Sequence, residues 1–335
     1  MIIPEPTNSV QNLIDAYHEA KQDEPRPYMG ASMLGHPCDR WLWLNFRWVI
    51  QQKFPGRIKR LFRRGQNEEA TIIQDLRAIG MDVRGAQTAV KFDGYVQGHM
   101  DAVIASGVPE APKKPHVAEF KTHSKKSFDD LKKNGVEKAK FEHFVQMQIY
   151  MLGAHIQQAL YVAVCKDDDR MYTERVKLDK ELAQKYVKRG QRIAFSDRMP
   201  PPLSTDPSWY QCKFCPAYNF CHQQELPKHF NCRTCAHSTA AEEPESFVCE
   251  KFGGNEIPIE FQRKGCDSGT IHPDIVPWKY STERDYVIWH TPFGDIAQGE
   301  PDANIYAASE VLANSQACAA GAGDIRAKFD GKVIG

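Results

Sequence analysis

The chain has 335 residues, and its 43 lysines and arginines balance 43 aspartates and glutamates, giving a formal net charge of +0. This balance excludes a global field that attracts nucleic acid, so any such contact has to come from local basic patches. The sequence has no apolar run of membrane-spanning length and no signal peptide, which predicts a cytoplasmic protein without a membrane partner. Ten cysteines are unusual in a reducing compartment unless some of them bind metal.

The first part of the chain predicts helices joined by polar segments. Residues 1–30 are polar and contain a short amphipathic helix over residues 10–21. An aromatic-rich helix is predicted over residues 38–49. Residues 56–64 carry five basic residues in nine, which form either a solvated helix face or a patch that contacts phosphate. A further helical pattern follows and ends at Gly80.

The middle of the chain predicts strands and helices in mixed order. Strands are expected around residues 95–105, 117–122, 158–167 and 170–178, and helices over residues 141–155 and 179–198. The lysine-rich stretch of residues 124–141 is expected to be a mobile, solvated connector. With the helix that ends at Gly80, these elements give the order α, β, β, α, β, β, α.

Two of the expected strands carry acidic and basic residues at positions that suit a metal site. Asp101 lies near the end of the first, while Glu119 and Lys121 share a face of the second because residues two apart in a strand point the same way. Phe120 then points into the core. If the strands pair, Asp101 meets Glu119, and two such close carboxylates are tolerable with a hard cation such as Mg²⁺ between them. By itself this pattern is common by chance in a chain with 43 acidic residues.

The following helix adds a more specific signal, since Gln146 and Tyr150 are four residues apart and share one helix face. A GxxD strand, an ExK strand and a QxxxY helix occur in this order as Gly98–Asp101, Glu119–Lys121 and Gln146–Tyr150. The chain therefore resembles the RecB-like branch of the PD-(D/E)XK nuclease superfamily. The resemblance implies an α/β, restriction-endonuclease-like core, in which a mixed central sheet is flanked by helices, with a cysteine-rich metal-binding module after it.

The resemblance also implies roles for individual residues. Mg²⁺ or Mn²⁺ is expected on Asp101, Glu119 and the backbone carbonyl of Phe120, with assistance from Glu69 in preference to Glu68. Lys121 is expected to orient or deprotonate the attacking water. The expected catalytic set is Glu69, Asp101, Glu119, Lys121, Gln146 and Tyr150. His99 is expected beside the site, where it either contacts phosphate or, in the preferred interpretation, occupies the opposite strand face. Candidate contacts to DNA phosphate are Arg60, Arg63, Arg64, Lys125 and Lys126.

Three cysteines follow the expected core with the spacing Cys212-x₂-Cys215-x₅-Cys221, and a four-cysteine site needs one more ligand. This arrangement is similar to that of the iron–sulfur RecB-like nucleases, which include AddB and the CRISPR-adaptation nucleases. The resemblance implies a structural [4Fe-4S] cluster on these three cysteines and Cys38, which lies ahead of the core.

A second group, Cys232-x₂-Cys235 followed by Cys249 and Cys266, predicts a small four-cysteine zinc site. There is an alternative partition, in which the Cys212/Cys215 and Cys232/Cys235 pairs form one zinc ribbon. The first partition uses Cys38 and Cys221 as well, and leaves spare only the two cysteines at positions 165 and 318.

These expectations divide the chain into five parts: an N-terminal segment (1–30), the nuclease core (31–205), the cluster segment (206–230), a zinc module (231–275) and a C-terminal accessory segment (276–335). The resemblance, which extends to phage exonucleases, implies a metal-dependent DNA exonuclease that acts on linear DNA in phage-type recombination, replication or repair. It implies an annealing protein or a helicase as a possible partner, and the host cytoplasm as the location if the protein is phage-encoded. The alternative is a non-catalytic DNA-binding accessory protein with the same fold. The intact ExK motif argues against this alternative.

Overall fold

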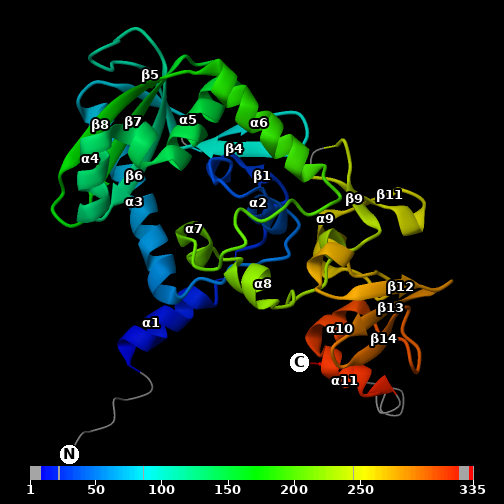
Figure 1. Ribbon diagram of the computed structural model, residues 1–335. Coiled ribbons are helices and arrows are strands. Elements are labelled where there is room, and N and C mark those ends of the chain that lie inside the picture. The colour runs from blue at the N-terminus through cyan, green and yellow to red at the C-terminus, as the bar shows by residue number, and fades with distance from the viewer. Residues whose placement is uncertain (1–8, 22, 86, 244, 324–331, 335) are drawn as a thin grey trace, which may run out of the picture. The chain divides into compact units, whose positions relative to one another are not determined.

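The computed structural model describes residues 9–21, 23–85, 87–243, 245–323 and 332–334 (Figure 1). Two compact units are present: residues 1–36 with 52–190, and residues 37–51 with 191–335. The segment 37–51, expected within the nuclease core, thus belongs to the unit that contains the C-terminal half of the chain. In the parts described, no helix is both long and apolar enough to cross a membrane.

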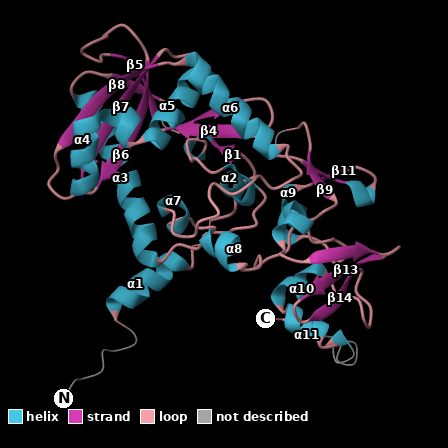
Figure 2. Ribbon diagram, in the orientation of Figure 1, coloured by secondary structure: helices cyan, strands magenta, loops and turns pink. Residues whose placement is uncertain are grey.

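The first unit is built on a five-stranded mixed sheet (Figure 2). The strand order is β2-β5-β6-β7-β8, in which β6 and β7 are parallel and the other pairs are antiparallel. The strands are β2 (Asp82–Arg84), β5 (Ala102–Ser106), β6 (His116–His123), β7 (Gln158–Cys165) and β8 (Met171–Lys177). The helices of this part of the chain are α1 (Val10–Glu19), η1 (Ala31–Met33), α3 (Gly56–Ala78), α4 (Lys125–Ala139), α5 (Phe141–Gly153) and α6 (Lys180–Ala194).

The two faces of strand β6 have different chemistry. Phe120 is buried in an apolar cluster with Ile72 and Leu76 of α3 and with alternate residues of β7, as expected from strand alternation. Glu119 and Lys121, on either side of Phe120 in the chain, face the opposite side of the sheet. Helices α4 and α5 cover that side (Figure 1). A purely apolar layer therefore supports the sheet from one side and leaves the other side for polar groups.

The expected strand over residues 95–105 is broken at Asp101. Its first half, β4 (Val96–Met100), belongs to a second sheet of order β1-β4-β3, with β1 (Met29–Gly30) and β3 (Thr88–Lys91). Its second half, β5, joins the five-stranded sheet. Asp101 thus occupies the bend where the chain passes from one sheet to the other.

Another expectation about local structure was wrong. The lysine-rich stretch is the helix α4, and its residues Phe128, Leu131 and Val136 are buried. The lysines obscured this apolar stripe, but they stand on the solvent side of the same helix. Residues 56–64 and the following helical pattern form one continuous helix, α3, because Gly65 is tolerated in a helix interior at a cost of about 1 kcal/mol.

The second unit combines short elements. Its helices are α2 (Asp39–Phe46), α7 (Tyr210–Lys213), α8 (Tyr218–Gln223), η2 (Cys232–Thr234), η3 (Glu250–Phe252), α9 (Ile259–Lys264), η4 (Pro273–Ile275), α10 (Ala308–Ala313) and α11 (Ser315–Ala319). One sheet has the order β11-β10-β9, formed by β9 (Ser238–Ala240), β10 (Phe247–Cys249) and β11 (Asn255–Ile257). The other has the order β12-β13-β14, formed by β12 (Lys279–Thr282), β13 (Tyr286–Thr291) and β14 (Gly294–Gly299).

Candidate active site

The pairing of β5 with β6 brings the two predicted carboxylates together. Ala102 is opposite Ala118, so Asp101 comes beside the next residues of β6. Asp101 Oδ2 accepts a hydrogen bond from the backbone N–H of Phe120 at 2.8 Å. Lys121 Nζ forms an ion pair with Glu119, lies 3.7 Å from Asp101 Oδ2 and donates to the Phe120 carbonyl at 3.1 Å. One ammonium group therefore contacts three of the oxygen donors that sequence reasoning assigned to a metal.

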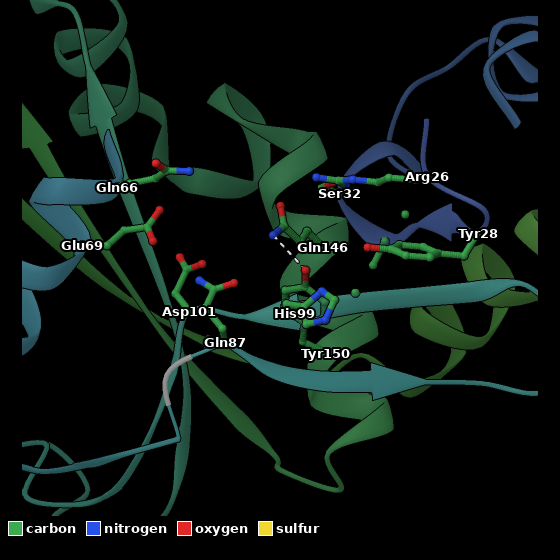
Figure 3. Close-up of a pocket in the computed structure, with 13 residues that line it drawn as sticks. Arg26, Tyr28, Ser32, Gln66, Glu69, Gln87, His99, Asp101, Gln146 and Tyr150 are labelled. Carbon is green, nitrogen blue, oxygen red and sulfur yellow. Dashed lines mark hydrogen bonds between the residues drawn. The ribbon is translucent and has the colours of Figure 1, made fainter. Parts of the chain in front are cut away.

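Helix α5 contributes the next layer of the site. Gln146 Nε2 donates to Glu119 Oε2 at 3.2 Å. It also donates to the Tyr150 hydroxyl at 3.2 Å (Figure 3). A Cβ at Gly98 would stand 2.5 Å from Tyr150 Cε1 and 2.8 Å from its hydroxyl oxygen. The glycine of the GxxD segment is therefore needed because the ring of Tyr150 packs directly on the backbone of β4.

The electrostatics of the site show unfavourably crowded carboxylates. Burial raises the pKa of Glu69 to about 7, with a further contribution from the negative charge of Asp101. Burial also raises the pKa of the fully buried Glu119 to about 7, against the opposing effect of Lys121. Burial disfavours the charged form of Lys121, but the carboxylates of Glu119 and Asp101 outweigh this and raise its pKa. Lys121 is therefore a firmly protonated cation in this arrangement, and it is poorly suited to remove a proton from water.

Glu69, Asp101, Gln146 and Tyr150 line a cavity of about 560 Å³ in the first unit. Glu69 lines it and Glu68 does not, so α3 aims the expected glutamate at the site. Figure 3 shows Glu69 and Asp101 on one side of the cavity and Arg26 and Tyr28 on the other. The volume is within the range of small-molecule sites, about 300–1,000 Å³.

Several residues of the cavity were not identified from the sequence. Arg26 and Tyr28 lie in the polar N-terminal segment, and neither they nor Ser32 belonged to a predicted motif. His99, whose preferred interpretation placed it on the opposite strand face and whose alternative placed it beside the site, is exposed and lines the cavity, with its ring 6.5 Å from that of Tyr28. The parallel pairing of Met29 with Val96 explains why the segment that holds Arg26 and Tyr28 lies beside β4. Further lining residues are Gln66 and Gln87.

A hydrogen-bonded chain continues the polar face of β6 beyond Lys121. The Tyr161 hydroxyl lies 2.9 Å from His123 Nε2 and 2.9 Å from His143 Nδ1. Burial, followed by nearby lysine charges, lowers the pKa of His123 to about 4 and that of His143 to about 3. Both imidazoles are therefore neutral at ordinary pH, and the chain packs behind the site without adding charge to it.

The proposed DNA-contact residues are mostly engaged with other parts of the first unit. Arg60 forms an ion pair with Asp15 of α1 at 3.2 Å, and Arg63 lies 3.4 Å from His18 Nε2. Arg64 donates to the carbonyl of Lys166 at 2.8 Å, Lys125 pairs with Asp129 at 2.6 Å, and Lys126 is exposed. Helix α1 thus partly neutralises the basic half of α3.

The cysteines of the second unit fall into two sets. The thiol of Cys215, whose pKa burial raises to about 11, interacts electrostatically with Cys38, Cys221 and Cys212. Burial raises the pKa of Cys232 to about 12, and its interacting thiols are Cys235, Cys266 and Cys249. The sequence pairs that would form a single zinc ribbon are thus distributed between two sets.

Within the described ranges, no three or more acidic, histidine or cysteine side chains are grouped so that they could hold a metal ion. In the carboxylate site, the charge of Lys121 stands where a cation is expected. The chemistry of the donors still fits a hard cation, since the carboxylates of Asp101 and Glu119 and the carbonyl of Phe120 converge on one cation, the Lys121 ammonium.

Comparison with known proteins gives a family. The model of the PD-(D/E)XK nuclease superfamily matches residues 11–222. Among solved structures, an alkaline exonuclease from Laribacter hongkongensis is 16% identical, with 54% of this chain and 90% of that chain covered and a TM-score of 0.35. A phage-related exonuclease from Haemophilus somnus is 18% identical, with coverage of 39% and 69% and a TM-score of 0.31. The protein SSO0001 is 14% identical, with coverage of 64% and 96% and a TM-score of 0.40. Comparison with curated proteins finds no match.

Proposed function

The chain belongs to the PD-(D/E)XK nuclease superfamily, and from this premise we propose that it is a divalent-metal-dependent DNA nuclease that hydrolyses phosphodiester bonds. One observation carries the proposal: Asp101, Glu119 and Lys121 meet on one face of the sheet, and Gln146 of α5 bonds to Glu119. A protein that only binds DNA has no need for buried carboxylates whose charges oppose one another.

The residues that would hold Mg²⁺ or Mn²⁺ are Asp101, Glu119, the Phe120 carbonyl and Glu69. When bound, such an ion lowers the pKa of a water ligand and acts as a Lewis acid on the phosphate. With the carboxylates engaged by such an ion, Lys121 would be placed to contact the phosphate or the attacking water. Because its pKa is raised, we assign it to orientation of the water and to charge compensation.

The second wall of the cavity supports binding of a DNA strand there. Arg26 supplies a planar cation suited to phosphate, and Ser32 and His99 add hydrogen-bonding groups. Tyr28 offers a ring on which a base can stack. A cavity with walls on both sides suits the end of a strand, so exonuclease action is the finer form of the proposal.

The first cysteine set fits the iron–sulfur cluster that the family resemblance implies. Its four thiols come from three segments, at Cys38, Cys212/Cys215 and Cys221, and interact with one another. Donors also point at the sulfurs: the Trp41 N–H lies 3.4 Å from Cys38 Sγ, and Arg40 bonds to Cys221. Such donors are typical partners of cluster thiolates. When bound, the cluster would cross-link α2 to the segment of α7 and α8, a structural role.

The test is degradation of end-labelled linear DNA and of closed circular DNA, with Mg²⁺ or Mn²⁺, by protein purified without air. Wild type is compared with Lys121→Ala and with Lys113→Ala, which changes an exposed lysine in the turn before β6. Loss of linear DNA alone, abolished only by Lys121→Ala, is expected of an exonuclease. Cleavage of circles would indicate an endonuclease. Intact DNA binding without any cleavage would instead support the accessory-protein alternative.

A further inference from the structure

The second cysteine set occupies one small cavity of the second unit. Cys232, Cys235, Cys249 and Cys266 all line a space of about 20 Å³, which is about the size that holds one small occupant. They come from three separate places in the local chain: a C-x₂-C turn at η2, the end of β10 and the residue after Gly265. Convergence of four thiols from separated segments is unusual for cysteines that serve only as apolar packing.

The backbone around this cavity is arranged for sulfur ligands. The N–H of His237 points to Cys235 Sγ at 3.5 Å, Thr270 supplies a second backbone bond to the same sulfur, and Gly265 supplies one to Cys232. Hydrogen bonds from N–H groups stabilise thiolates that bind metal. His237 also lines the cavity, but its Nε2 lies 2.9 Å from Thr270 Oγ1. The donor set is therefore four sulfurs.

The segment around this cavity has only a small sheet of its own. Its sheet has three strands of three residues each, β9, β10 and β11. A sheet of this size buries too little apolar surface to be stable alone and usually needs a metal or disulfides. Tetrahedral coordination by four thiolates is typical of structural Zn²⁺.

The residue between the first two cysteines makes a contact with a distant helix. Arg233 is fully buried, and its guanidinium carbon stands 4.1 Å from the Trp48 ring centroid and 4.4 Å from that of Phe247. It donates to the Phe46 carbonyl, at the end of α2, at 3.0 Å and to Gln262 Oε1 at 2.9 Å. The other end of α2 begins at Cys38, which caps the helix.

We propose that Cys232, Cys235, Cys249 and Cys266 bind one Zn²⁺ ion, and that this ion holds Arg233 in the position from which it fixes the end of α2. The charge of Arg233 is buried among aromatic rings, so its position has to be enforced by the backbone on either side. Cys232 and Cys235, which would bind the zinc on either side of Arg233 in the turn, supply that constraint. The proposal does not depend on nuclease activity.

The first experiment measures bound zinc and iron in anaerobically purified protein. Wild type is expected to carry one zinc per chain, and Cys249→Ser and Cys266→Ser are expected to lose zinc and keep their iron. Cys318→Ala, which removes a buried thiol of the same unit outside both sets, should keep zinc. Absence of zinc from wild type, iron in its place, or zinc retained in both serine variants would overturn the site.

The second experiment tests the link to α2 by hydrogen exchange of the amides of residues 39–46. Removal of zinc with a chelator is expected to raise exchange there in wild type. Arg233→Met should keep its zinc and show fast exchange with or without the chelator. Unchanged exchange in wild type after zinc loss would overturn the link, and this result is readable even if the Arg233→Met protein does not fold.

Discussion

Gln146 Nε2 donates to Glu119 Oε2 at 3.2 Å, so a helix residue 27 positions along the chain holds one of the two central carboxylates directly. The same amide nitrogen lies 3.2 Å from the Tyr150 hydroxyl. The QxxxY pair is therefore a support for Glu119, and its contribution to activity is expected to pass through the position of that carboxylate.

Replacement of Gln146 by leucine removes a hydrogen bond to a charged group. Such bonds contribute about 1.5–3 kcal/mol, so kcat is expected to fall by about 10- to 100-fold. The measurement is single-turnover cleavage at saturating Mg²⁺. Gln157→Leu, which changes an exposed glutamine after the same helix, is the control and should cleave like wild type. An unchanged rate in Gln146→Leu would contradict the supporting role.

Gly98→Ala tests the close approach of Tyr150 to β4. The new Cβ would meet the tyrosine ring at 2.5 Å, so α5 or the ring has to move. Overpacking of this kind costs about 1–3 kcal/mol of unfolding free energy, and activity should fall with it. Gly65→Ala is the matched control, because nothing lies within 4 Å of its Cβ and a helical Gly→Ala change is expected to stabilise by about 0.5–1 kcal/mol. Equal stability of both variants would refute the packing argument.

The raised pKa of Glu119 predicts a dependence of stability on pH in buffer without divalent cations. The folded protein binds the proton more tightly than the unfolded chain does, since the pKa is about 7 when folded and 4.5 in the reference state. The Glu119 carboxyl therefore stabilises the folded protein most at pH values below the unfolded pKa. About 3 kcal/mol of unfolding free energy is lost as pH rises through 7. Thermal melting at a series of pH values measures it.

Glu119→Gln should reduce that pH dependence, because the neutral amide has no proton to release and only the share of Glu69 remains. Mg²⁺ should stabilise wild type more at high pH than at low pH, since it competes with the proton for the same carboxylates. Cleavage by wild type should correspondingly increase as pH rises through about 7, where Glu69 and Glu119 lose their protons. A wild-type profile that matches Glu119→Gln would show that burial does not raise this pKa.

Arg26→Ala is expected to weaken DNA binding at the cavity. Loss of one charge-assisted phosphate contact should lower kcat/KM by about 10- to 100-fold, mainly through KM. Arg26→Lys keeps the charge and should recover part of the loss. Arg84→Ala, which removes an exposed arginine paired with Asp82, serves as the control. Equal effects of the two alanine variants would indicate a general charge effect.

Cys221→Ser tests the proposed cluster separately from the reaction. Iron content and visible absorbance should fall in this variant and persist in Cys165→Ala, which changes the buried cysteine at the end of β7. Zinc content should be unaffected in both. Full iron content in Cys221→Ser would remove Cys221 from the ligand set.

Local pattern was sufficient for the elements that carry the motifs. Alternation along β6 placed Phe120 in the core and Glu119 on the opposite face, and helical spacing identified α5. Both signals are periodic and short-range, so they depend only on neighbouring residues. The same reasoning misread α4, because its apolar stripe is narrow and most of its residues are lysines or other solvated groups.

The sequence by itself determined the acidic, lysine and cysteine residues available for chemistry, their order and the elements that bear them. Only the tertiary structure decided that the chain bends at Asp101 from one sheet into another, that β1 brings Arg26 and Tyr28 to the cavity, and that four cysteines of the second unit line one small cavity. These outcomes depend on strand pairing and packing between residues far apart in the chain. Such contacts have no periodic signature, because their partners are selected by the fold and not by their sequence neighbours.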